Sequence, residues 1–97
     1  MKKHFVLKLI PNRPSFAQDM TNEERMVMQK HVAYWTKLMS EGKVLVFGPV
    51  LDPAATYGLG IVEVDSEEDV KELIANDPAI SINNYEYYSM LAITPNV

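Results

Sequence analysis

Residues 21–42, TNEERMVMQKHVAYWTKLMSEG, carry the strongest helical pattern of this 97-residue chain. Thr21 and Glu24 have the spacing of a capping box, in which each side chain bonds the backbone N–H of the other residue. Gly42 stands where a left-handed residue commonly ends a helix. Between them, apolar residues recur at three- and four-residue steps, at Val27, Met28, Val32, Trp35, Leu38 and Met39. The stretch therefore predicts a long amphipathic helix with one face against a core.

Segments with the composition of β-strands flank this helix on both sides. We expect strands at residues 3–10, 44–50, 58–64 and 85–94. A second, shorter helix is expected between Ser66, which can cap it, and Pro78, which disfavours its continuation because proline has no backbone N–H to donate. Asn83 and Asn84 are expected to form the turn into the last strand.

The order of these elements predicts the fold. Strand, helix, strand, strand, helix, strand is the split βαβ pattern of a ferredoxin-like α+β fold, with an antiparallel sheet and both helices on one face. Residues 1–97 are short enough for a single domain, and 47% hydrophobic with 23% charged residues is an ordinary globular composition. We therefore predict one ferredoxin-like βαββαβ domain.

The strands do not alternate cleanly between apolar and polar residues. Phe5, Leu7 and Leu9 point to one side of the first strand, but Val6 and Ile10 point to the other. A sheet with one face in water normally carries more polar residues on that face, and a large exposed apolar patch is uncommon on a monomer. We expect a second copy of the chain to cover the open face, which makes the protein a homodimer.

The composition argues against several classes of partner. The chain has nine basic and thirteen acidic residues, and the basic ones are scattered, so nucleic acid is not expected as a partner. No apolar run approaches the roughly 20 residues that span a bilayer, so we expect no membrane segment. The sequence contains no cysteine, which is consistent with a reducing, cytoplasmic location and removes thiolate nucleophiles and ligands.

His31 is the residue of the long helix best suited to chemistry, because it shares the apolar face with Trp35 and Leu38. An imidazole in such surroundings loses solvation unless it finds a partner. Asp52 and Asp77, each followed by proline, are the two candidate partners, since an aspartate on one ring nitrogen raises the basicity of the other. The structural alternative is that His31 donates to a backbone carbonyl and both aspartates cap turns.

Other side chains are weaker candidates. Tyr34 and Trp35 are candidates to line a ligand pocket, although large residues at helical spacing are more often core and rim residues. Ser89 is a candidate pocket hydroxyl. The tyrosines of the last strand could stack on an aromatic ligand, but aromatic residues in a strand more often pack across the sheet or an interface, and that is expected here. No metal site is expected, because His4 and His31 lie on distant elements.

Several of these features occur together in a known family. They are His31 with Tyr34 and Trp35, Gly42, Gly48-Pro49 with Asp52, Gly58, Ser66-Glu67-Glu68, and Asp77-Pro78. In their order and spacing the chain resembles the YCII-related domain family over nearly its whole length. The resemblance implies a dimeric α+β barrel and a histidine and an aspartate near a small pocket. It also implies an enzymatic role, with one branch similar to a dehydrochlorinase of a hydroxylated aromatic.

Two functions from different classes follow. The first is a small cytoplasmic enzyme without a cofactor, in which His31, oriented by Asp77 or Asp52, moves a proton on a small cyclic or aromatic molecule in lyase or isomerase chemistry. The alternative is a non-catalytic dimeric protein that binds a small molecule or serves as an accessory protein.

Overall fold

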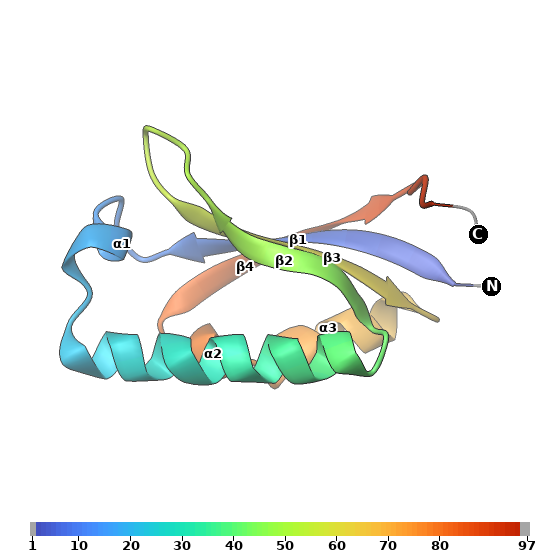
Figure 1. The fold of residues 1–97 in the computed structure, drawn as a ribbon, viewed down its shortest axis with the longest axis horizontal. Helices are drawn as coiled ribbons and strands as arrows, with labels where there is room; N and C mark the ends of the chain where they lie inside the picture. The colour runs from blue at the N-terminus through green and yellow to red at the C-terminus, as the bar shows by residue number, and fades with distance from the viewer. Residues whose placement is uncertain (1, 96–97) are drawn as a thin grey trace.

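The computed structural model describes residues 2–95 and confirms the ferredoxin-like α+β fold (Figure 1). Its strands form one antiparallel sheet in the order β2-β3-β1-β4. The elements in chain order are β1 (Lys3–Pro11), α1 (Phe16–Asp19), α2 (Asn22–Ser40), β2 (Val44–Val50), β3 (Tyr57–Val64), α3 (Glu67–Ala75), the 3-10 helix η1 (Pro78–Ser81) and β4 (Asn83–Met90). Figure 1 shows α2 and α3 together beneath the sheet, and no helix above it among the described residues.

The long helix α2 is bounded by the residues that the sequence indicates. The Glu24 N–H donates to Thr21 Oγ1 at 3.1 Å, and the Thr21 N–H donates to Glu24 Oε1 at 2.9 Å, so the capping box is complete. At the other end Gly42 has a φ of +81°, a conformation that a side chain would strain. Both ends of α2 are therefore set by local chemistry.

The two faces of the sheet are in different environments. Phe5, Leu7 and Leu9 of β1 are buried against the helices, where they meet Trp35 and other residues of one continuous core. On the opposite face Val6 lies between Ile61 and Tyr88 in the strand register, and Tyr88 is 55% exposed. The expectation from the sequence that both faces of the sheet carry apolar residues is confirmed.

The last strand and the turn before it differ from the prediction. Residues 83 and 84 are the first residues of β4, paired with Pro11 and Ile10 of β1, so the predicted Asn83-Asn84 turn is wrong. The chain reverses earlier, in η1, which Asp77 caps and Pro78 begins. The strand ends at Met90 instead of residue 94, because Met90, opposite His4, is the last residue of β4 that pairs with β1.

A short helix, α1, lies between β1 and α2, outside the elements expected from the sequence. Arg13 holds this segment: its Nε donates to Asp19 Oδ1 at 2.8 Å, and its Nη2 donates to Glu24 Oε1 at 2.9 Å. These bonds with Arg13, together with the Thr21 N–H, lower the pKa of Glu24 to about 2. Phe16 is buried by this arrangement. The ion pairs therefore fix α1 to the start of α2.

Candidate functional site

The candidate site is built around Asp77, a carboxylate that is 1% exposed between α3 and η1. His31 Nδ1 lies 2.8 Å from its Oδ2 and 3.0 Å from its Oδ1. Trp35 Nε1 donates to Oδ2 at 2.7 Å, and the Tyr85 hydroxyl donates to the same oxygen. The Ala79 N–H donates to Oδ1 at 2.8 Å. Four donors therefore converge on one buried carboxylate.

Three elements bring these donors together. His31 and Trp35 are four residues apart on α2, so their side chains lie on one face of the helix and reach the same acceptor. Tyr85 comes from β4, whose register places it opposite Leu9 on the helix-facing side of the sheet. Asp77 itself caps η1, which fixes its backbone between α3 and β4. The cluster thus depends on the packing of α2, η1 and the sheet.

The donors decide the charge of Asp77. Burial by itself raises the pKa of a carboxyl group, but the hydrogen bonds from His31, Tyr85, Trp35 and Ala79 outweigh it and hold the pKa of Asp77 below its usual value. Burial and the bond to this carboxylate raise the pKa of Tyr85. Asp77 is therefore an anion that accepts hydrogen bonds, and Tyr85 stays a neutral donor.

An ionised Asp77 also sets the tautomer of His31. A carboxylate can only accept, so Nδ1 of the imidazole carries the proton that it donates to Asp77. In the neutral ring the lone pair then lies on Nε2, for which no hydrogen bond is found within residues 2–95. This is the arrangement in which a histidine can take a proton from a bound molecule.

His31 also lines a cavity of about 250 Å³ between α1, α2 and the sheet. Most of its wall is apolar, contributed by Leu7, Leu9, Pro11, Phe16, Ala17, Met20, Met28, Val32, Trp35, Phe47, Pro49 and Leu59, with backbone at the glycines of β2 and β3. Polar groups come from His31, Asn83, Tyr85, Thr56 and Tyr57. A small apolar molecule with a few polar substituents matches such a lining.

Glycine keeps this cavity open on the sheet side. Gly58 of β3 lies opposite Leu9, and a Cβ at Gly58 would stand 3.1 Å from the Leu9 Cβ. Gly60 lies opposite Leu7, and a Cβ at Gly60 would be in van der Waals contact with the Phe47 side chain, at 3.6 Å. Side chains at these two positions would occupy the helix-facing side of β3, where the cavity lies.

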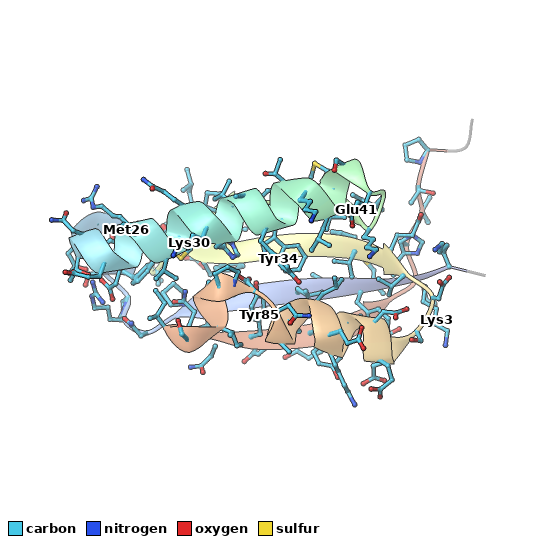
Figure 2. The ribbon with its side chains drawn as sticks, turned by 90° about the horizontal axis from the view of Figure 1, so that it is seen from below. Lys3, Met26, Lys30, Tyr34, Glu41 and Tyr85 are labelled. Carbon is cyan, nitrogen blue, oxygen red and sulfur yellow. The ribbon has the colours of Figure 1, made fainter. Side chains whose placement is uncertain are left out.

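The other residues that the sequence singles out lie elsewhere. Asp52 is exposed in the β2–β3 loop, where its Oδ1 accepts from the Ala54 N–H at 2.8 Å, so the carboxylate on His31 is Asp77. Ser89 is exposed near the end of β4, outside the cavity lining. Tyr34 donates to the Leu73 carbonyl at 2.7 Å, and Figure 2 shows it between α2 and α3. Burial, with the charge of Asp77, raises the pKa of Tyr34 to about 12.

Sequence reasoning missed two members of this region. Tyr85 was expected to pack or to stack on a ligand, and its role as a hydrogen-bond donor to Asp77 was not predicted; Figure 2 shows it behind η1. Asn83 was expected in a turn, yet it lines the cavity. The alternation of Asn83, Tyr85 and Tyr87 along one strand is the signal that would have placed them on the same face.

Two further properties concern the described residues as a whole. Among residues 2–95, no group of three or more histidine or acidic side chains is arranged to hold a metal ion. None of the helices in this part of the chain has the length and hydropathy needed to cross a membrane.

Comparison with known proteins gives a family and a fold. The family model of the YCII-related domain matches residues 5–94. No curated protein matches the chain. Among solved structures, the chain is similar to 5-chloro-2-hydroxyhydroquinone dehydrochlorinase from Burkholderia phenoliruptrix AC1100, in complex with 2,5-dihydroxybenzoquinone. The two are 22% identical with a TM-score of 0.63, over 87% of this chain and 90% of the other. This likeness shows a shared fold.

Proposed function

The chain belongs to the YCII-related domain family, and we propose that it is an enzyme that moves a proton on a small cyclic molecule, with His31 as general base. One observation carries the proposal: Nδ1 of His31 is held by the buried Asp77 carboxylate while the same ring lines an apolar cavity. Asp77 orients the ring and fixes its tautomer, and Nε2 exchanges the proton.

The proposed step begins with removal of a proton from the bound molecule. Nε2 of His31 takes a proton from a hydroxyl or a C–H group of the bound ring, and the electron pair that is released moves into the ring. In lyase chemistry a leaving group then departs with its electron pair, and in isomerase chemistry the proton returns to a different atom. The predominantly apolar wall of the cavity supports this role, because electrostatic effects are stronger in surroundings of low dielectric constant.

The name of the structural relative suggests the first substrates to test. We expect 5-chloro-2-hydroxyhydroquinone or a related hydroxylated, halogenated ring to lose halide in the presence of the protein, measured as chloride release and as quinone absorbance. His31→Ala should reduce kcat by about 10²–10⁴-fold, the usual contribution of a positioned general base. Equal turnover by the His31→Ala variant and the parent protein would refute the proposal.

The two aspartates provide the matched control for this experiment. Asp77→Asn keeps the shape of the side chain but removes the charge that orients His31, so kcat should fall. Asp52→Asn makes the same chemical change in the exposed β2–β3 loop, and kcat should stay within twofold of the parent. Similar losses in both variants would show that the aspartate next to His31 has no special role.

Binding without reaction is the second candidate function, favoured by the predominantly apolar wall of the cavity. Such a protein would retain an aromatic molecule and release it unchanged. Equilibrium binding of 2,5-dihydroxybenzoquinone by both the parent and the His31→Ala variant, with no turnover of any ring tested, would favour this function over catalysis.

We further propose that the protein acts as a homodimer in which a second copy covers the open face of the sheet. Val46, Tyr88 and Met90 on this side of the molecule are 57%, 55% and 40% exposed. Ile61 and Val6 lie between Val46 and Tyr88 in the strand register, so the apolar surface is continuous across the sheet, which is uncommon on a monomer. Sedimentation equilibrium should therefore give about twice the mass of one chain, and Tyr88→Glu should shift the protein toward the monomer. A parent protein that sediments as a monomer at micromolar concentration would contradict this.

A further inference from the structure

Asn83 is a buried polar residue whose hydrogen-bonding capacity the protein leaves unused. The residue is 7% exposed, and in the described part of the chain its Oδ1 is the one deeply buried side-chain oxygen or nitrogen without a partner. Within residues 2–95 the one hydrogen bond of its Nδ2 is to the Met28 sulfur, at 3.6 Å, and a thioether is a weak acceptor. An unsatisfied buried amide destabilises a protein and therefore needs an explanation.

The local structure does not require an asparagine at this position. Asn83 begins β4 opposite Pro11, and its side chain makes no hydrogen bond to the backbone of the preceding turn, which Asp77 caps instead. The alternation of the strand places Asn83 on the helix-facing side with Tyr85 and Tyr87, where an apolar residue of similar volume would fit a core. Neither capping nor turn formation therefore accounts for the amide.

The cavity gives a reason for the amide. Asn83 and His31 both line it. Met28, which accepts a hydrogen bond from Asn83 Nδ2, and Pro11, the strand partner of Asn83, line it as well. Tyr85 also lines the cavity, but its hydroxyl is already bound to Asp77. Asn83 thus lies at the wall of a space in which most other groups are apolar, and it carries an acceptor that no protein group in residues 2–95 uses.

We propose that Asn83 is a specificity-determining residue that accepts a hydrogen bond from a hydroxyl substituent on an apolar cyclic ligand in this cavity. A hydroxyl both donates and accepts, so it satisfies the amide in either orientation of the side chain. A site built to bind a hydroxyl discriminates against the analogue that lacks it, because the buried polar group is then left unpaired. The inference deepens the proposed function by naming the substituent, and it concerns binding alone.

The test compares two ligands that differ in one group. 4-Methylphenol and 1,4-dimethylbenzene have nearly the same shape, and only the first carries a hydroxyl. We expect the parent protein to bind 4-methylphenol more tightly, as measured by NMR titration, and Asn83→Leu to reduce this preference by about 5–10-fold, the effect of one neutral hydrogen bond. In the absence of ligand, the Tm of Asn83→Leu should equal or exceed that of the parent, because an unsatisfied amide has been replaced by an apolar group.

Control variants separate this inference from its alternatives. Asn84→Leu changes the neighbouring exposed residue on the other face of β4, and it should leave the preference unchanged. An unchanged preference in Asn83→Leu, or a parent protein that binds the two ligands equally or binds neither, would overturn the proposal. A fall in Tm without a change in preference would assign Asn83 a purely structural role. Because no turnover is measured, these outcomes are independent of whether His31 acts as a base.

Discussion

Asp52 and Asp77 make the same local hydrogen bond in very different surroundings. Each precedes a proline, and each accepts a hydrogen bond at 2.8 Å through Oδ1 from the N–H two residues ahead, that of Ala54 or Ala79. Asp52 is exposed and has this local bond alone among those found in residues 2–95. Asp77 is 1% exposed and also accepts from His31, Trp35 and Tyr85. The comparison shows that a turn-capping aspartate becomes a candidate catalytic partner through tertiary contacts alone.

Removal of the Asp77 carboxylate should therefore produce the largest change in stability. Asp77→Ala leaves the donors of His31, Trp35, Tyr85 and Ala79 without their acceptor in a buried region, and we expect a loss of about 3–5 kcal/mol in the free energy of unfolding. Urea denaturation followed by circular dichroism measures this loss. If Asp77→Ala does not fold, Asp77→Asn, which keeps one acceptor oxygen, should still be less stable than the parent by about 2 kcal/mol.

Acid should reduce the stability that the ionised Asp77 carboxylate contributes to the folded protein. The pKa of Asp77 is lowered from its ordinary value of 3.8, so the unfolded chain binds the proton more tightly than the folded protein does. The stability contributed by the charge is fully present above the unfolded value and is lost as the pH falls through the lower folded value. The difference in unfolding free energy between the parent and Asp77→Asn should therefore be constant near neutral pH and shrink below about pH 4. Urea titrations at a series of pH values measure it, and a difference that grows toward low pH would contradict this account.

The fold was largely predictable because its signals are local. The capping box of Thr21 and Glu24, the glycine at residue 42 and the apolar spacing between them act within one helix, and all three have the predicted role. The short helices α1 and η1 were not predicted. The first depends on the pairing of Arg13 with Glu24 across the loop, and neighbouring residues alone do not indicate such a contact.

The site was predictable only in part for the same reason. His31 could be selected from its place on the apolar face of α2, but Asp52 and Asp77 have the same local pattern and could not be separated. Their difference arises from the packing of α2, η1 and β4 around one of them. The spacing of His31 and Trp35, four residues apart, was an unused signal that both side chains reach one group. Asn83 was misassigned because its turn propensity is outweighed by pairing with β1.

The smallest effect is expected at Asp52, and it provides the sharpest check on the comparison. Asp52→Ala removes a bond to the Ala54 N–H that has the same length as its counterpart at Asp77, so any difference between the two variants reflects surroundings and not local geometry. Water can replace the lost acceptor in the exposed loop, and we expect the free energy of unfolding to fall by about 0.5 kcal/mol. The same urea denaturation measures it. A loss approaching that of Asp77→Ala would mean that the turn itself supplies most of the stability at both positions, and Asp77 would then be a structural cap that happens to contact His31.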